Sequence, residues 1–217
     1  MKGYKHFYSS QGFVPATFPL WPKRFPVIQP WRRLFDLSAA LCGCLLLLFI
    51  LPGLWLVNLL FSPGPLFYRQ TRVGAQGQAY TMFKLRSMVV EAEKEGIVWT
   101  SQDDPRITVV GHFLRKTHVD ELPQFWNNLR DEMSLIGPRP ERPEFVELLT
   151  KEIEGYSKRH SVKPGITGWA QVNYGYTDSI EGTRIKLQYD LEYIKHQSLG
   201  LDTLILWRTF GVIWKGR

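Results

Sequence analysis

Cysteine is scarce in this sequence. The chain of 217 residues contains two cysteines, Cys42 and Cys44, which stand one residue apart inside an apolar run. Side chains at this spacing point in different directions on a helix, and no further cysteine is available elsewhere in the chain. The sequence therefore excludes a disulfide framework and a cysteine-ligated metal cluster.

Charge is missing from residues 37–61, a stretch of 25 residues. A helix of this length would measure roughly 37 Å, enough to span the hydrocarbon core of a bilayer with some tilt. A buried helix of a soluble protein is seldom so long and so uniformly apolar. Pro52, followed by Gly53, interrupts the run and predicts a kink, because proline cannot donate a hydrogen bond to the Leu48 carbonyl.

Acidic residues are missing from residues 62–90, so both flanks of the apolar run are basic. The flanking cations are Lys23, Arg24, Arg32 and Arg33 before the run and Arg69, Arg72, Lys84 and Arg86 after it. A straight span would place one basic flank on the wrong side of a membrane, whereas a helix that breaks at Pro52 returns both flanks to one side. We therefore predict a re-entrant membrane hairpin over residues 32–62, with partners for its backbone at the break.

Net charge and proline content further limit the kind of partner and the structure of the N-terminal segment. A net charge of +7 indicates an anionic partner, which could be nucleic acid, lipid headgroups or a phosphorylated substrate, and the uncharged run argues against nucleic acid. Residues 1–31 alternate prolines with aromatic residues, which predicts an irregular leader and no signal peptide. Residues 63–217 are long enough for one domain with its own core.

An adjacent pair of acids, Asp120 and Glu121, precedes an apolar helical pattern. The pattern consists of Leu122, Phe125, Trp126, Leu129 and Met133, and predicts a helix with these side chains packed inward. Its N-cap is either Thr117 or Asp120, and Pro123 favours Asp120 because proline is tolerated in a first turn. Neighbouring carboxylates raise each other's pKa unless a cation neutralises them, and a divalent metal would do so. A simple capping role for Asp120 is the alternative.

Two strands, residues 66–73 and 79–86, are predicted around a four-residue turn with glycine at both ends. Alternation sends Phe83 and Leu85 to one face and Lys84 and Arg86 to the other. The two cations could hold a phosphate or meet lipid headgroups.

Further cations and loops surround the acid pair in sequence. Arg115 lies five residues before Asp120, and the stiff turn 137–140 fixes Arg139 either for bidentate phosphate recognition or for pairing with a surface acid. Residues 163–172 form a second loop, whose Gly165 and Gly168 allow a ligand to approach closely unless the loop is a plain surface turn.

Helices are predicted over residues 143–156, 181–197 and 201–214. The last one carries Trp207, Phe210 and Trp214 on a broad apolar face that either lies on a membrane or packs in the core.

The motifs that combine these features are the apolar helix with its proline break, Phe83-Lys84-Leu85-Arg86, Asp120-Glu121-Leu122-Pro123-Gln124, Met133-Ser134-Leu135-Ile136-Gly137-Pro138-Arg139-Pro140 and Pro164-Gly165-Ile166-Thr167-Gly168-Trp169-Ala170-Gln171-Val172. In this order they resemble the bacterial sugar transferases, the monotopic polyprenyl-phosphate phosphoglycosyl transferases. The similarity runs from about Arg32 to the C-terminus. Small members often have serine before the break proline, where this chain has Leu51, and larger members carry further N-terminal membrane helices, so the chain resembles the compact form.

The resemblance implies transfer of a sugar 1-phosphate from a UDP-sugar to undecaprenyl phosphate, with release of UMP, at the cytoplasmic face of the bacterial inner membrane. This step begins the assembly of exopolysaccharide, O-antigen or another lipid-linked glycan. By position, Asp120 would be the nucleophile that takes up the phosphosugar and Glu121 would hold Mg²⁺. The remaining implied site residues are the phosphate-binding Arg115, Arg139, Lys84 and Arg86 and the substrate loop with Pro164, Gly165, Gly168 and Gln171.

The expected architecture is α+β and predominantly helical: a re-entrant membrane hairpin, a small β-hairpin, and amphipathic interfacial helices around a catalytic helix. Residues 1–31 would be the leader, 32–62 the membrane segment and 63–217 the cytoplasmic catalytic domain. The partners would be the two substrates and membrane lipids, without nucleic acid, and a homodimer is left open. The rival interpretation is a membrane-associated lipid- or polysaccharide-binding protein without catalysis.

Overall fold

The computed structural model describes residues 30–94, 96, 104–175, 177 and 179–215, so the expected leader lies almost entirely outside the described residues. The helices are α1 (Pro30–Phe61), α2 (Val109–Lys116), α3 (Gln124–Leu129), α4 (Pro143–Glu152), α5 (Trp169–Tyr174), α6 (Ile180–His196) and α7 (Leu199–Lys215). The strands are β1 (Phe67–Val73), β2 (Ala79–Leu85), β3 (Ser134–Ile136) and β4 (Gly165–Thr167). The expected mostly helical fold with a small β-hairpin is confirmed.

The β-hairpin forms where the sequence predicts it. β1 and β2 pair antiparallel, with Tyr68 opposite Lys84 and Val73 opposite Ala79. The turn between them contains Gln76 and Gly77, both with positive φ (57° and 75°), a conformation that suits the glycine. β1 and β2 form a two-stranded sheet, so the second edge of β2 needs other partners for its backbone.

β3 and β4 form a short parallel pair, with Ser134 opposite Gly165 and Ile136 opposite Thr167. The backbones here approach so closely that glycine is required. A β-carbon on Gly165 would lie 2.0 Å from the Gly137 nitrogen, and one on Gly168 would lie 2.2 Å from the Gly137 oxygen. The surface-turn alternative for residues 163–172 is therefore wrong, because these residues form a strand and the start of α5.

The core of the globular part lies between the hairpin and the C-terminal helices. One buried cluster joins β1 to α4 and α6 and comprises Val73, Val146, Leu149, Ile153, Tyr156 and Leu187. A second contains Ile136, Tyr193 and Ile205 and joins β3 to α6 and α7. The predicted helices over 143–156, 181–197 and 201–214 correspond to α4, α6 and α7, with ends that differ by a few residues.

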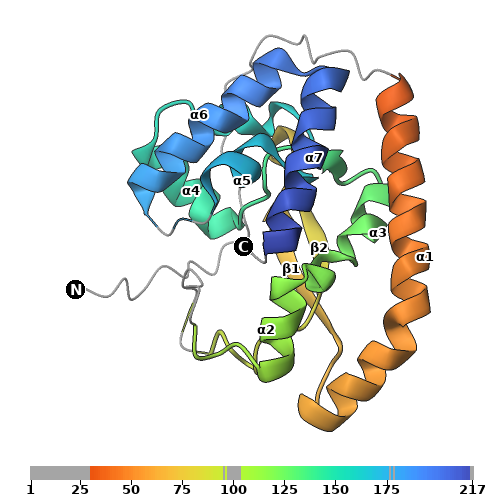
Figure 1. Ribbon diagram of the computed structural model, residues 1–217. Helices are drawn as coiled ribbons and strands as arrows, with labels where there is room; N and C mark the ends of the chain where they lie inside the picture. Colours follow the sequence, from red (N-terminus) through yellow and green to blue (C-terminus); the bar gives the residue numbers. More distant parts are fainter. Residues whose placement is uncertain (1–29, 95, 97–103, 176, 178, 216–217) are drawn as a thin grey trace.

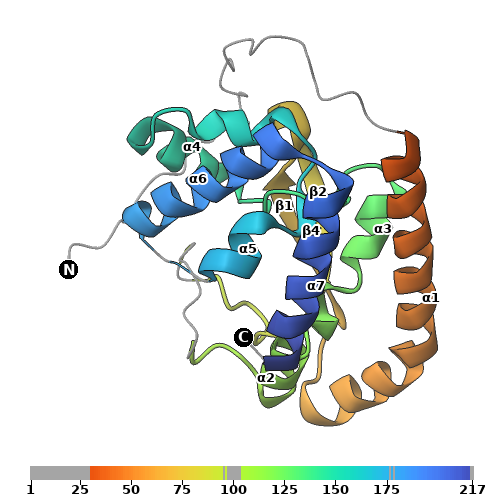
Figure 2. The same cartoon turned by 45° about the horizontal axis from the view of Figure 1, so that its top comes forward.

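α1 is one helix that contains Pro52 and bends toward its C-terminal end in both views (Figures 1 and 2). It does not divide into two antiparallel arms. By length and composition, residues 31–61 could cross a membrane, and only 11% of their most apolar window is buried by the rest of the structure. A core helix of a soluble protein would be mostly buried, so the outer face of α1 is free for an apolar environment.

Both ends of α1 are attached to the globular part by polar contacts. At the N-terminal end, Arg32 forms an ion pair with Asp202 at 2.6 Å, and Asp36 accepts hydrogen bonds from Ser134 Oγ and the Leu135 nitrogen, each at 2.8 Å. At the C-terminal end, Arg86 donates to Asn58 Oδ1 of the helix at 3.0 Å. α3 packs against the middle of the helix and lies between α1 and α7 (Figures 1 and 2).

Candidate functional site

The acid pair lies in a short 3-10 turn, Val119–Glu121, between α2 and α3. The turn begins after His118, which adopts left-handed backbone angles (φ 55°, ψ 16°). Pro123 is the N-cap of α3, and Thr117 is the C-cap of α2. Both predicted N-caps, Thr117 and Asp120, are therefore wrong, because the chain makes a separate turn before the helix begins. The alternative in which Asp120 only caps the helix is therefore also wrong.

The buried face of α3 is polar instead of apolar. Gln124, Asn127 and Asn128 are buried, whereas Trp126 is 52% exposed. The prediction that the apolar side chains of this segment all pack inward is thus wrong for Trp126. Phe125 does face the neighbouring α1, where it contacts Gly43. The helix consequently presents amides to the hairpin and aromatic rings to α1 and the surroundings.

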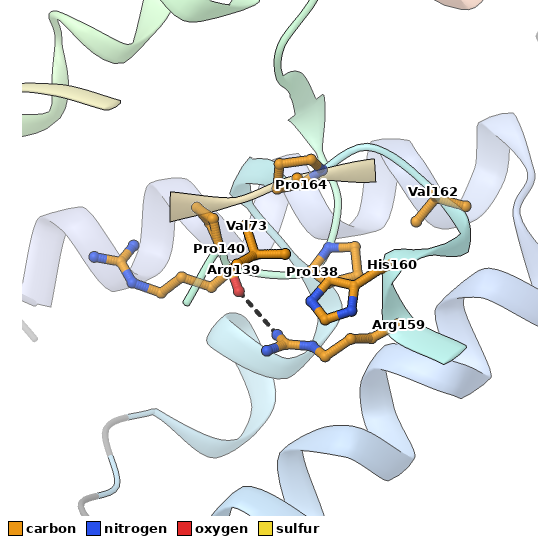
Figure 3. Close-up of a pocket in the computed structure, with 9 residues that line it drawn as sticks. Val73, Pro138, Arg139, Pro140, Arg159, His160, Val162 and Pro164 are labelled. Carbon is orange, nitrogen blue, oxygen red and sulfur yellow. Dashed lines mark hydrogen bonds between the residues drawn. The ribbon is translucent and has the colours of Figure 1, made fainter. Parts of the chain in front are cut away.

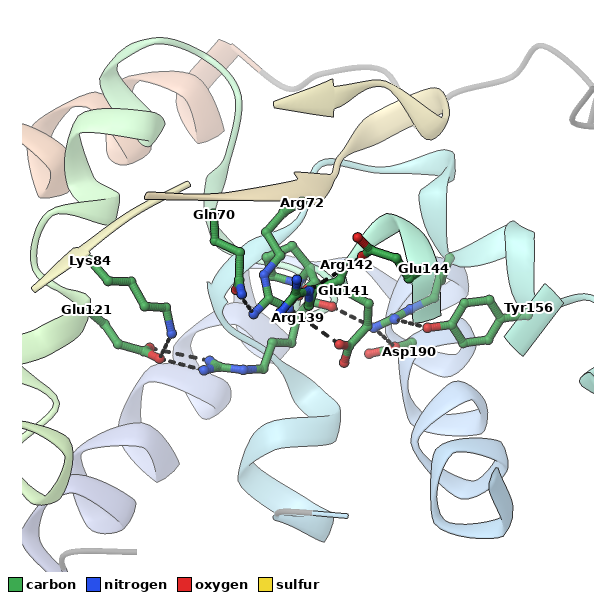
Figure 4. Close-up of polar contacts among 12 residues, drawn as sticks. Gln70, Arg72, Lys84, Glu121, Arg139, Glu141, Arg142, Glu144, Tyr156 and Asp190 are labelled. Carbon is green, nitrogen blue, oxygen red and sulfur yellow. Dashed lines mark hydrogen bonds and ion pairs between the residues drawn. The ribbon is translucent and has the colours of Figure 1, made fainter. Parts of the chain in front are cut away.

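Glu121 is held between two cations (Figure 4). Its Oε1 lies 3.0 Å from Lys84 Nζ and 2.5 Å from Arg139 Nη2, and its Oε2 lies 3.4 Å from Arg139 Nη1. Burial raises the pKa of the Glu121 carboxyl, but Arg139 and Lys84 together hold that pKa well below its ordinary value. Glu121 is therefore ionised, and protein cations supply the neutralisation for which the sequence suggested a divalent metal.

Asp120 is in a different situation although it is the next residue. Its side chain is buried, with 6% exposure. Among the described residues, the Asp120 carboxylate has no hydrogen-bond or ion-pair partner. Burial raises the pKa of Asp120, the negative charge of Glu121 raises it further, and Lys84, Arg115 and Arg139 oppose the rise. A buried carboxylate with nearby cations but no direct partner is a good candidate nucleophile, because its lone pairs are not engaged.

The turn that carries Arg139 is fixed through its backbone. Four successive carbonyls accept hydrogen bonds: Pro138 from the Gly165 nitrogen (3.0 Å), Arg139 from Arg159 Nη2 (2.8 Å), Pro140 from Arg72 Nη1 (3.0 Å) and Glu141 from the Val73 nitrogen (2.9 Å). Figure 3 shows the Arg139 carbonyl directed toward Arg159, while the Arg139 side chain extends the other way. The guanidinium is thereby delivered to Glu121 and is still 38% exposed.

The other predicted cations separate into two groups. Lys84 and Arg115 approach the acid pair, since both lower the pKa of Asp120, and Arg115 also donates from Nε to Ser87 Oγ at 2.9 Å. Arg86 lies elsewhere. Its guanidinium donates to the carbonyls of Ser62, Pro65 and Met88 and to Asn58 Oδ1, so it holds the C-terminal end of α1 to β2. These contacts engage Arg86 in structure, and alternation alone did not distinguish it from Lys84.

The predicted substrate loop is built into the β3–β4 pair. Gly165 and Gly168 pack against Gly137, so their close approach serves the backbone, which in turn places the Arg139 turn. Pro164 accepts a hydrogen bond from the Ser134 nitrogen at 2.9 Å. Gln171 Nε2 donates to the Ile166 carbonyl at 3.2 Å, and its buried Oε1 has no hydrogen-bond partner among the described residues.

Sequence reasoning missed the arginines that support the turn. Arg159 is buried, forms an ion pair with Asp190 at 2.7 Å and donates to Tyr156 Oη at 2.7 Å. Arg72 was considered only as part of a basic flank, yet it binds the turn. The usable signal was an arginine placed three residues after Tyr156, at the end of the apolar face of a predicted helix.

The Mg²⁺ site predicted at Glu121 would need ligands in addition to the described side chains. Within the described part of the chain, no group of three or more His, Cys, Asp or Glu side chains converges. Mg²⁺, however, is commonly bound by one or two carboxylates together with substrate phosphates. Glu121 supplies one carboxylate, so phosphate oxygens and water would have to complete the coordination.

Comparison with known proteins yields consistent matches. The sequence model described as bacterial sugar transferase matches residues 27–216. The chain is 42% identical over 191 residues to the UDP-N-acetylgalactosamine-undecaprenyl-phosphate N-acetylgalactosaminephosphotransferase of Aeromonas hydrophila, covering 88% of this chain and 45% of the relative. It is 46% identical over 177 residues to the UDP-glucose:undecaprenyl-phosphate glucose-1-phosphate transferase of Escherichia coli (strain K12), covering 79% and 38%.

A third relative has a more similar length. The chain is 38% identical over 179 residues to the uncharacterized sugar transferase EpsL of Bacillus subtilis (strain 168), covering 81% of this chain and 83% of the relative. The chain thus spans less than half the length of the first two relatives and most of the length of the third.

Proposed function

Because the chain belongs to the bacterial sugar transferase family, we propose that it transfers a sugar 1-phosphate from a UDP-sugar to undecaprenyl phosphate and releases UMP. Relatives whose names state this type of reaction, with different sugars, support the proposal. The observation that carries it is the contrast within the acid pair. Asp120 is buried without a partner among the described residues, next to a Glu121 that is fixed by Lys84 and Arg139.

In the proposed reaction Asp120 is the nucleophile. A carboxylate oxygen attacks the phosphorus that carries the sugar, the bond from that phosphorus to the bridging oxygen breaks, and UMP departs with the bond's electron pair. The resulting aspartyl phosphosugar is an acyl phosphate. A phosphate oxygen of undecaprenyl phosphate then attacks the same phosphorus, which frees the Asp120 carboxylate and forms the lipid-linked diphosphate sugar. Covalent catalysis divides one difficult transfer into two easier ones.

The cations of the site would bind and neutralise the phosphates. Arg139 is suited to this role because its turn is rigid and its guanidinium is partly exposed. Lys84 and Arg115 lie close enough to influence Asp120 and would face the same phosphates. Glu121 would hold Mg²⁺ together with phosphate oxygens, and the bound ion would supply further neutralisation of the diphosphate charge. Arg86 is left out of this set because its donors are engaged at the end of α1.

The attachment of α1 supports re-entrant insertion into one leaflet. Polar side chains tie both ends of the helix to the same globular part, through Arg32 and Asp36 at one end and Arg86 at the other. A helix that crossed the bilayer would carry one end away from that domain. The exposed apolar face between the two anchors is then available to lipid, and both basic flanks stay on the cytoplasmic side.

α7 supports contact with a membrane as well. Trp207, Phe210 and Trp214 are exposed, so the core-packing alternative for this apolar face does not explain them. Ile205, on the opposite side of the helix, is fully buried. An interfacial position of α7 at the membrane would cover the exposed aromatic side chains.

The test is the reaction itself. The full chain in detergent or nanodiscs, supplied with undecaprenyl phosphate, Mg²⁺ and a panel of UDP-sugars, is expected to release UMP with one or a few of the sugars and to form a lipid-linked product. Lipid binding without UMP release from any sugar would favour the non-catalytic lipid-binding interpretation.

A further inference from the structure

Asn127 of α3 is fully buried, with 0% exposure, and its side-chain amide forms three hydrogen bonds. Its Oδ1 accepts from the backbone nitrogen of Phe83 at 3.1 Å. Its Nδ2 donates to the Thr81 carbonyl at 2.7 Å and to Glu132 Oε2 at 2.7 Å. Two of these three bonds therefore go to the backbone of β2.

The two backbone groups belong to the edge of β2 that β1 does not cover. In an antiparallel pair, alternate residues direct their N–H and C=O groups away from the partner strand, so Thr81 and Phe83 point to the same open edge. The Asn127 amide meets them as the peptide group of a third strand would, with one acceptor and one donor. A single side chain thus fixes the position of β2 relative to α3.

The position of β2 relative to α3 determines whether Lys84 can pair with Glu121. Lys84 directly follows Phe83 in β2, and Glu121 stands three residues before α3 begins. Lys84 Nζ and Glu121 Oε1 are 3.0 Å apart. Among the described residues, the two hydrogen bonds of Asn127 are the only ones that join a side chain of α3 to the backbone of β2. Movement of β2 along α3 would separate the two charges.

We propose that Asn127 is a positioning residue for the proposed reaction: it acts through β2 to hold the Lys84 ammonium against Glu121 and beside Asp120. This inference deepens the proposed function and rests on it for the catalytic meaning of Lys84. The placement of Lys84, however, can be measured without any turnover. The rival explanation is that Asn127 stabilises the fold in general, because truncating it leaves buried backbone groups unpaired.

Lysine labelling distinguishes the two explanations. The folded full chain in detergent is treated briefly with an acetylating reagent, and modification of each lysine is quantified by peptide mass spectrometry. In the parent protein Lys84 is 16% exposed and ion-paired, so it should react slowly. In Asn127→Ala, labelling of Lys84 is expected to rise about tenfold, which corresponds to a change of about 1.4 kcal/mol in the equilibrium that frees it.

Lys186 of α6 is the internal reference, because it is also partly buried but lies outside this contact. Its labelling should change less than about twofold, well below the effect of one lost hydrogen bond. Equal increases at Lys84 and Lys186 would mean general loosening and would overturn the proposal, as would unchanged labelling of Lys84. Tyr193→Phe is the matched control variant, since it removes a buried hydroxyl that bonds Asp202 and Arg32 far from β2, and it should leave Lys84 protected.

A second variant covers the case in which Asn127→Ala does not fold. Asn127→Asp has the same shape and keeps the acceptor for Phe83, but it loses both donors and places a negative charge opposite the Thr81 carbonyl and Glu132. It should also expose Lys84 selectively, and uniform labelling of both lysines in this variant would likewise overturn the proposal.

Activity provides the remaining arm. In Asn127→Ala, kcat for UMP release should fall at least about tenfold while KM for the UDP-sugar changes little, because the misplaced ammonium is needed to stabilise the transition state. In the double variant with Lys84→Met, removal of Asn127 should cause no further loss. If the parent chain released no UMP, the proposed function would fail, while the labelling result would still decide the role of Asn127.

Discussion

Gly43 of α1 touches the ring of Phe125 of α3 so closely that a β-carbon at position 43 would lie 2.2 Å from Phe125 Cδ2. Non-bonded carbon atoms do not approach so closely, so a larger residue at position 43 would force the Phe125 ring or the helices to shift. Ala40, one turn earlier on α1, is fully buried. α1 and α3 therefore touch where α1 carries the small residues Ala40 and Gly43. The position of α3 depends on this contact.

The first prediction concerns this contact. Gly43→Ala should lower the free energy of unfolding by about 1–3 kcal/mol, because an extra methyl group in a packed interface forces the surroundings to shift. Gly53→Ala is the matched control, since nothing lies within 4 Å of its β-carbon position. It should be neutral or stabilising by up to about 1 kcal/mol through helix propensity. Thermal unfolding in detergent, followed by circular dichroism, measures both. Equal effects of the two variants would contradict the packing argument.

The second prediction separates the two acids by chemistry. Asp120→Asn should form no phosphosugar adduct at any Mg²⁺ concentration, because the attacking oxygen has lost its charge. Glu121→Gln retains the nucleophile but weakens the proposed Mg²⁺ site, so activity should be low and should partly return at raised Mg²⁺. UMP release without acceptor and intact-protein mass after trapping are the measurements. An adduct in Asp120→Asn equal to that of the parent would rule out Asp120 as the nucleophile.

The third prediction separates the same acids by stability. Since the folded state raises the pKa of Asp120, its ionised form is destabilising above the ordinary aspartate pKa, and Asp120→Asn should be more stable than the parent at pH 7. The folded state lowers the pKa of Glu121, so that carboxylate stabilises the fold above the ordinary glutamate pKa. Glu121→Gln should therefore lose about 3 kcal/mol at pH 7, the low end for a broken buried ion pair, because Arg139 is partly exposed.

The advantage of Asp120→Asn should begin to shrink above the ordinary aspartate pKa, where the folded parent takes up a proton at Asp120, and it should vanish below that pKa, where the unfolded chain is protonated too. The loss in Glu121→Gln should shrink only below the ordinary glutamate pKa, where the unfolded chain takes up its proton before the folded parent does. Denaturant unfolding of the three proteins between pH 7 and pH 3 provides the comparison. Changes of the same sign in both variants at pH 7 would contradict the opposite pKa shifts.

The fourth prediction concerns topology. In a background without Cys42 and Cys44, single cysteines introduced as Ser9→Cys and Gln78→Cys should both react with a membrane-impermeant reagent from the cytoplasmic side, because both flanks of α1 stay on that side. Sealed inverted vesicles provide the assay, and reaction of only one site would indicate a span. Adding Pro52→Ala should straighten the helix and favour crossing. Unchanged labelling in that variant would show that the bend does not depend on Pro52 alone.

Much of the secondary structure follows from local patterns. The β-hairpin at residues 67–85, the helices α4, α6 and α7, and the apolar length of α1 are set by alternation, by helical spacing and by the lack of charge, which act over neighbouring residues. The acid pair and its family motif were also readable. The errors include the start of α3, where the separate turn Val119–Glu121 precedes the N-cap Pro123, and the inward packing of Trp126.

The sequence by itself determined which residues carry charge near the site and that a long segment must avoid water. Only the tertiary structure decided how those charges are used. Lys84 and Arg86 point to the same side of one strand by alternation, yet one pairs with Glu121 and the other ties down α1, because their partners come from segments distant in the sequence. Likewise the glycines at 137, 165 and 168 are required by contact between two backbones, and Asn127 by an open strand edge. Such contacts depend on which elements meet in space, and local sequence patterns do not encode that.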